Sequence, residues 1–211
     1  MGTKEGSRLT AKDESLWMNE APYRDEGRLV AGMDEAGRGP LAGPVCAACV
    51  ILPPGEAIPG LRDSKKLSAK RRLDLAAEIR RKAQAYCIAF ASVEEVDRLN
   101  ILGATMLAMK RAIEGMPVRP DLVLVDGDKV PDWPGELRAV IGGDDLMPSI
   151  AAASILAKVQ RDHIMTLIAA EEPRYGFETH KGYGTKMHYQ ALDAYGESLY
   201  HRKSFLRRWK K

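Results

Sequence analysis

The sequence contains only three cysteines in 211 residues. An odd, small number of cysteines argues against a disulfide framework and favours a reducing, cytoplasmic location. Cys46 and Cys49 form a CxxC pattern, but no second cysteine pair completes a zinc site. Because this pattern lies within a predicted strand, we interpret both residues as buried structural cysteines.

Long apolar runs are also absent. None reaches the length of about 18 residues that a membrane-spanning helix needs. The first 28 residues are polar and lack the apolar core of a secretory signal, so we expect no export by that route. The sequence contains neither a GxGxxG fingerprint nor a Walker A loop, which argues against a nucleotide cofactor.

The length and a hydrophobic content of 45% suit one large α/β domain, or one such domain with a small appendage. We expect strands at residues 29–34, 43–52, 86–93, 121–126 and 137–141, and helices at 69–83, 101–114 and 149–171, with a short helical turn at 93–95. Ser68 is the predicted N-cap of the first helix. Its buried side is predicted to consist of Leu73, Ala76, Ala77, Ile79 and Ala83.

The net charge is only +3, but the positive charge is concentrated in two segments. Residues 62–82 hold nine Lys or Arg against three acidic residues, and residues 197–211 hold six against one. The remainder of the chain is therefore net negative. Basic segments beside an acidic centre suit a protein that binds a phosphate backbone at a metal site. The alternative for each segment alone is an ordinary solvated surface.

Carboxylates stand at the ends of several predicted strands, next to glycine. Asp34 and Glu35 end the first strand, and Asp126 ends a strand of consecutive apolar residues. Asp144 follows the fifth strand, directly after two glycines. Open α/β sheets bind ligands beyond their strand ends, and hard divalent cations take oxygen ligands. The recurrence at three strand ends therefore predicts a metal site.

A different interpretation of the first strand end remains open. An Asp-Glu pair before a glycine-rich segment is often only a solvated turn. Neighbouring residues on a regular strand also point to opposite faces, so Asp34 and Glu35 serve one site only if the pleat breaks at Glu35. Ala36 and Gly37 would permit such a break.

Two glycine-rich segments are candidates for ligand contact. Residues 37–39, Gly-Arg-Gly, follow the acidic pair, and backbone N–H groups at glycines can approach a ligand closely. Tyr183 lies between two glycines, which predicts a ring presented to a partner; the alternative is a tyrosine that closes a turn onto the core. His180 and His188 lack a partner pair at metal-ligand spacing, so we expect a solvated or phosphate-contacting role for them.

Seven segments together carry a family resemblance. In chain order they are MDEAGRGPLAGPV, DSKKLS, LVDG, GGDD, SIAAASILAKVQRD, HKGYGT and HRKSF, and they span residues 33–205. Each is weak alone, but the ordered set is highly specific. The sequence resembles the bacterial ribonuclease HII family, the type 2 ribonucleases H.

The resemblance implies a ribonuclease H-like α/β fold with a mixed five-stranded sheet flanked by helices and a C-terminal helical extension. We expect a catalytic domain at residues 28–172, a basic, helical substrate-binding region at 173–211, and a polar, flexible extension at 1–27. The family's catalytic, metal-binding acidic set maps onto Asp34, Glu35, Asp126 and Asp144. Its substrate-binding residues map onto Gly37, Arg38, Gly39, Tyr183 and, as a phosphate contact, Lys65.

The implied activity is cleavage of the phosphodiester 5′ to a ribonucleotide, in RNA/DNA hybrids and at single ribonucleotides embedded in duplex DNA. The products would carry 3′-hydroxyl and 5′-phosphate ends, and two Mg²⁺ or Mn²⁺ ions about 4 Å apart would support the chemistry. Such an enzyme would act as a cytoplasmic monomer that removes misincorporated ribonucleotides. One alternative is another metal nuclease or resolvase that has no use for residues 37–39 or Tyr183. Another is a non-catalytic nucleic-acid-binding module that does not use the carboxylates.

Overall fold

The computed structural model describes residues 10–24, 27–55 and 57–209. Five strands form one sheet in the order β3-β2-β1-β4-β5. Their bounds are β1 Val30–Ala36, β2 Val45–Ile51, β3 Ala85–Ala91, β4 Leu122–Asp126 and β5 Glu136–Val140. β4 is parallel to both β1 and β5, whereas β2 is antiparallel to both β1 and β3. The sheet is therefore mixed, as predicted.

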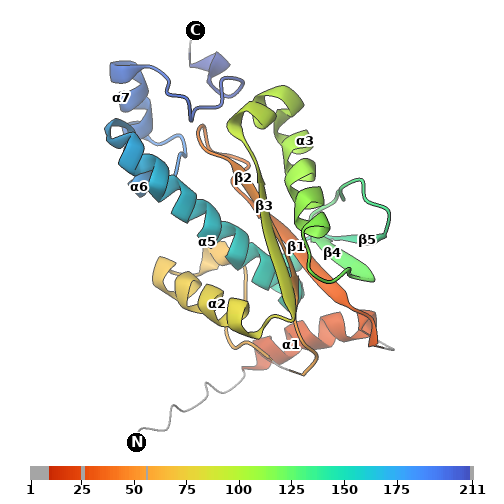
Figure 1. Ribbon diagram of the computed structural model, residues 1–211. Helices are drawn as coiled ribbons and strands as arrows, with labels where there is room; N and C mark the ends of the chain where they lie inside the picture. Colours follow the sequence, from red (N-terminus) through yellow and green to blue (C-terminus); the bar gives the residue numbers. More distant parts are fainter. Residues whose placement is uncertain (1–9, 25–26, 56, 210–211) are drawn as a thin grey trace, which may run out of the picture.

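Helices cover both faces of this sheet. The α-helices are α1 Ala11–Glu20, α2 Ala69–Lys82, α3 Val93–Glu114, α4 Gly143–Leu146, α5 Pro148–Glu171, α6 Phe177–His180 and α7 Lys186–Tyr195. Short 3₁₀ helices occupy Ala21–Tyr23, Ser64–Lys66, Pro173–Tyr175 and Leu206–Arg208. α5, with α1 and α2, packs on one face and α3 on the other (Figure 1). β2 is buried along its whole length between them, which confirms that Cys46 and Cys49 are structural.

The contact of α5 with β1 is unusually close. A Cβ atom at Gly32 would lie 2.1 Å from the main-chain carbon of Ser149, so no larger residue fits at this point of β1. Ala151, Ala152 and Ala153 are fully buried in the same helix. Small residues on both sides thus bring the helix backbone against the strand, which fixes the distance between α5 and the strand end.

Two helices differ in detail from the sequence prediction. In α2 the buried residues are Leu75, Ala76 and Ile79, and Leu73 is 59% exposed. The predicted buried face therefore included Leu73 wrongly and omitted Leu75. The helical turn at 93–95 and the helix at 101–114 are both present but are joined in α3 by a kink at Asn100, where φ is 59°. The Asn100 side chain accepts bonds from the amides of Leu102 and Gly103, which starts the second helical segment.

Part of the N-terminal extension that we predicted to be flexible forms helix α1; residues 1–9 lie outside the described residues. α1 begins with a capping box formed by Thr10 and Asp13. Its last residue, Glu20, is fully buried, pairs with Arg24, and accepts bonds from the amide (3.0 Å) and hydroxyl (2.6 Å) of Ser149. A carboxylate at the first turn of α5 complements the helix dipole, so this segment stabilises the central helix.

The C-terminal region packs as a separate apolar cluster on the end of α5. Met165 and Ile168 of α5 contact Tyr175, Phe177 and Leu192 there. No described helix combines the length and apolar character that crossing a membrane requires.

Candidate active site

The ends of β1 and β4 place two carboxylates side by side. The strands are parallel, and their register pairs the residues that immediately precede Asp34 and Asp126. Alternation along each strand puts Asp34 on the face of Gly32 and Asp126 on the face of Leu124, both of which contact α5. The two carboxylates therefore lie at one level of the sheet and on one face.

Glu35 lies near the same site, although β1 lacks the break in its pleat at Glu35 that the sequence analysis had required. It pairs with Ala47 in the regular register of β1 and β2, so that expectation was wrong. Glu35 nevertheless lines the same pocket as Asp34. β4 ends at Asp126, one residue below the level of Glu35, so no strand covers that side of Glu35 and its longer side chain can reach the rim.

Asp144 reaches the site from the start of α4, after Gly142 adopts the left-handed conformation with φ of 67°. Asp126 Oδ1 accepts a bond of 2.7 Å from the amide of Gly143, which ties the end of β4 to this turn. Burial, and then the charge of the neighbouring Asp126, raises the pKa of Asp144 to about 6. Strand order thus brings the predicted acidic residues to one edge.

The pKa values of Asp34 and Glu35 also reflect repulsion between neighbouring carboxylates. Burial raises the pKa of Asp34 well above its usual range, and the charges of Glu35 and Asp126 add to the effect. Burial likewise raises the pKa of Glu35, although Arg38, 3.5 Å away, opposes this. Carboxylates that resist ionisation in this way are stabilised by a nearby cation.

The chemistry of this donor set fits a divalent metal. Carboxylate oxygens are the ligands of hard cations such as Mg²⁺ and Mn²⁺. Among the described residues, no three His, Cys, Asp or Glu side chains are already gathered into one ligating cluster. Metal binding is supported by the mutual electrostatic effect of the predicted carboxylates and by their common edge of the sheet. Asp34 and Asp126 would hold the ions, and Glu35 and Asp144 would each bind one of them.

A pocket of about 340 Å³ opens beside the acidic edge and contains most of the predicted site residues. Its lining consists of Asp34, Glu35, Ala36, Gly37, Arg38, Gly39, Ser64, Lys65, Ser154, Lys158 and Tyr183. The structure therefore brings together segments from the first strand, the 3₁₀ helix at Ser64–Lys66, α5 and the loop after α6. Asp126 and Asp144 border the site but do not line this pocket.

The Gly-Arg-Gly segment turns sharply at the end of β1. Gly37 has φ of 102°, a conformation that other residues adopt only with strain. Arg38 and Gly39 are exposed. A Cβ atom at Gly39 would lie 3.7 Å from Cε1 of Tyr183, so the tyrosine ring stands next to this backbone.

Tyr183 is presented to solvent, as predicted from its flanking glycines. Its side chain is 43% exposed, and the Nζ atom of Lys158 lies 5.9 Å from its ring centroid. A flat ring beside exposed backbone and a cation can pack against a sugar and its phosphate.

The sequence analysis did not assign four residues of the pocket to the site: Ala36, Ser64, Ser154 and Lys158. Ser154 and Lys158 are one helical turn apart in α5, a spacing that could have indicated a shared face. Ser154 Oγ lies 3.0 Å from Ser64 Oγ, and a hydrogen bond from Ser154 lowers the pKa of Asp34. Burial lowers the pKa of Lys65, but the acidic neighbours, Asp63 and Asp34 first, raise it overall, and the residue lines the pocket.

The prediction for the histidines was wrong. His180 and His188 are buried, and their rings stack with centroids 4.5 Å apart. His188 Nδ1 lies 2.9 Å from the carbonyl oxygen of Tyr183, and its Nε2 lies 2.9 Å from Nε2 of His201. These contacts hold the Tyr183 loop from beneath, so the histidines cannot contact solvent or phosphate.

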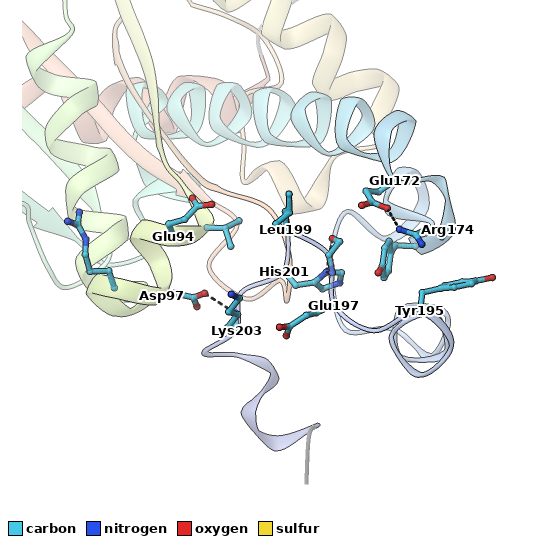
Figure 2. A pocket seen from close by; sticks show the side chains of 13 residues that line it. Glu94, Asp97, Glu172, Arg174, Tyr195, Glu197, Leu199, His201 and Lys203 are labelled. Atoms are coloured by element: carbon cyan, nitrogen blue, oxygen red, sulfur yellow. Dashed lines mark hydrogen bonds and ion pairs between the residues drawn. The ribbon is translucent and has the colours of Figure 1, made fainter.

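A larger cavity, of about 640 Å³, lies between the start of α3 and the C-terminal segment (Figure 2). Both charge signs line it: Glu94, Asp97, Glu172 and Glu197 on one hand, Arg98, Arg174 and Lys203 on the other. This cavity contains none of the predicted site residues, so the smaller pocket at the acidic edge is the candidate active site.

The sheet order and its flanking helices, with acidic residues at adjoining strand ends, define the ribonuclease H-like class of hydrolytic nucleases. Within that class the chain belongs to the ribonuclease HII family, whose sequence model matches residues 31–210. It is 58% identical over 184 residues to a ribonuclease HII of Verminephrobacter eiseniae, covering 87% of this chain and 88% of the relative. It is 57% identical over 179 residues to that of Burkholderia thailandensis, covering 85% and 84%.

Solved structures show the same fold. A ribonuclease H2 from Pyrococcus horikoshii superposes with a TM-score of 0.69 at 22% identity, covering 83% of this chain and 92% of that one. The ribonuclease HII of a PCNA complex from Archaeoglobus fulgidus gives 0.64 at 26% identity, covering 83% and 94%. A ribonuclease HIII, Bst-RNase HIII, in complex with Mn²⁺ gives 0.62 at 15% identity, covering 97% and 72%.

Proposed function

We propose that this protein is a divalent-metal-dependent endoribonuclease that cleaves the phosphodiester 5′ to a ribonucleotide. Its substrates are RNA/DNA hybrids and duplex DNA carrying single embedded ribonucleotides, and its products carry 3′-hydroxyl and 5′-phosphate ends. The observation that carries this proposal is the meeting of Asp34 and Asp126 at one strand edge with the Gly-Arg-Gly segment and Tyr183 beside them. The Mn²⁺ complex of the ribonuclease HIII with the same fold supports the choice of metal.

Bound Mg²⁺ or Mn²⁺ would activate the attacking water and stabilise the leaving oxyanion. The residues of the chain orient the substrate. Sequence readout cannot find one ribose among deoxyriboses, because only the 2′-hydroxyl distinguishes them. The backbone of residues 37–39, which is exposed at Arg38 and Gly39, can hydrogen-bond that hydroxyl beside the carboxylates. Tyr183 can lay its ring against the next sugar, which favours deoxyribose at that position.

Exposed basic residues of α2 supply a surface for the phosphate backbone in this proposal. Lys70, Arg80 and Arg81 are exposed on this helix. Arg72, by contrast, donates to the carbonyl oxygens of Ser64 and Leu67 and so has a structural role. Neutralising Lys70, Arg80 and Arg81 should weaken binding of all duplexes alike. The slope of the logarithm of the binding constant against the logarithm of salt concentration should become shallower by about one unit per lost phosphate contact. An unchanged slope would show that α2 is only a solvated surface.

The deciding experiment is cleavage of duplex DNA with one ribonucleotide, with Mg²⁺, with Mn²⁺ and with EDTA. All-DNA duplex of the same sequence is the control. The proposal requires a metal-dependent cut on the 5′ side of the ribonucleotide only. Cleavage of the all-DNA duplex would favour a different nuclease, and binding without cleavage would favour a non-catalytic module.

A further inference from the structure

Arg202 is fully buried, although it belongs to the basic tail that the sequence assigns to phosphate binding. Among the described residues, no acidic side chain forms a hydrogen bond or ion pair with it, and its guanidinium donates to main-chain carbonyls. These are Gly37 (2.7 Å), Arg38 (3.1 Å), Pro40 (2.8 Å), Gly43 (2.9 Å) and Pro44 (3.1 Å). Burial lowers the pKa of Arg202 to about 9, so the group remains charged at neutral pH.

These bonds fix the direction in which the peptide groups of the loop at residues 37–44 point. Its carbonyl oxygens are drawn inward onto the guanidinium. Two of its amides are used elsewhere: Leu41 N–H donates to Gly182 and Gly43 N–H to Tyr200, each at 2.8 Å. In the described part of the chain, no group accepts a bond from the amides of residues 37–39. The donors beside the carboxylates are thus left available to a ligand.

The tail holds Arg202 in this position from both sides. Its own amide donates to Leu41 O at 2.8 Å, and His201 forms a bridge with Ala42. On the other side Asp97 of α3 accepts from the amide of Lys203 at 3.0 Å (Figure 2) and from the amide of Ser204 at 2.9 Å. The tail that carries the arginine is therefore anchored both to the loop itself and, through Asp97, to α3 outside the loop.

We propose that Arg202 is a positioning residue for ribose selection: by binding the carbonyls of Gly37 and Arg38, it aims the Gly-Arg-Gly amides at the 2′-hydroxyl. The inference rests on the proposed function and names the residue that sets its specificity. A neutral core side chain of the same volume could fill the space but could not turn five carbonyls toward one point. Lysine would keep the charge but lacks the planar fork of donors.

The test compares affinity for two duplexes that differ by a single 2′-hydroxyl, measured by fluorescence anisotropy with Mg²⁺. The parent and Arg202→Lys are both placed in an Asp126→Asn background, in which we expect no cleavage. Loss of one or two aimed hydrogen bonds should reduce the preference for the ribonucleotide duplex by about tenfold. Affinity for the all-DNA duplex should change much less.

Asp97→Ala is the matched control, because it removes the contacts of the tail with α3 but retains the guanidinium and its five carbonyl partners. We expect it to lower the melting temperature while retaining the parent's ribose preference. An equal loss of affinity for both duplexes in Arg202→Lys, or the same loss of preference in Asp97→Ala, would reduce Arg202 to a structural residue. Failure of Arg202→Lys to fold at 10 °C, checked by circular dichroism, would also contradict a role confined to one loop. Absence of ribose preference in the parent would instead count against the proposed function.

Discussion

Replacing Asp144 by Asn is expected to stabilise the metal-free protein at neutral and alkaline pH. Burial, then the charge of Asp126, raises the pKa of Asp144 from 3.8 to about 6. A carboxyl group with a raised folded pKa binds more protons in the native state than in the unfolded chain. Its contribution to the free energy of unfolding is therefore lost as the pH rises from 3.8 to about 6, and stays lost above that range.

The size of the effect follows from the shift. One pKa unit corresponds to about 1.4 kcal/mol, so the full shift corresponds to about 3 kcal/mol. Solvent screening at a site that opens to a pocket reduces this to about 1 kcal/mol. For a chain of this length we expect Asp144→Asn to raise the melting temperature by about 2–4 °C at pH 8. At pH 4 both proteins carry a neutral group and should melt together.

The measurement is thermal unfolding by circular dichroism from pH 4 to 8.5 in EDTA. Asp145→Asn is the matched control, because Asp145 pairs with Lys12 and Lys66 and these contacts lower its pKa. The control should be slightly destabilised at pH 8, opposite in sign to its neighbour. The quantity to compare is the melting temperature of Asp144→Asn minus that of the parent. A smaller difference at pH 8 than at pH 4 would refute the electrostatic argument. Added Mg²⁺ should stabilise the parent more than Asp144→Asn.

Three further outcomes are expected. Asp126→Asn should abolish cleavage but keep or tighten duplex binding, because negative charge facing phosphate is removed; near-full activity would defeat the metal-site assignment. Tyr183→Ala should lose most cleavage at a single embedded ribonucleotide, and Tyr183→Phe less if the ring packs on the sugar; cleavage assays of both folded variants decide this. Burial, then His188, lowers the pKa of His201 from 6.5 to about 4, so protonation destabilises the fold as pH falls through that window. His201→Gln should show a shallower loss of melting temperature there, and an equal slope would contradict the assignment.

The sequence alone was enough to predict the acidic strand ends. Asp34 and Asp126 each follow apolar, strand-forming residues, and their signals are local: hydrophobicity, a carboxylate and a nearby glycine. Parallel pairing of the two strands then brings them to one edge. The flanking glycines of Tyr183 likewise predicted an exposed ring. Ser68 was recognisable as an N-cap because a cap depends only on the next few residues.

Only the tertiary structure decided what lies beneath the site. A lysine or arginine in a basic tail is ordinarily exposed, and no local pattern marks Arg202 as buried. Its burial depends on carbonyl groups 158 to 165 residues earlier in the chain. His188 and His201 are similarly explained only by each other, and Glu20 only by Ser149. A buried charge or imidazole is stable only where distant groups satisfy it, and the fold alone determines which distant groups those are.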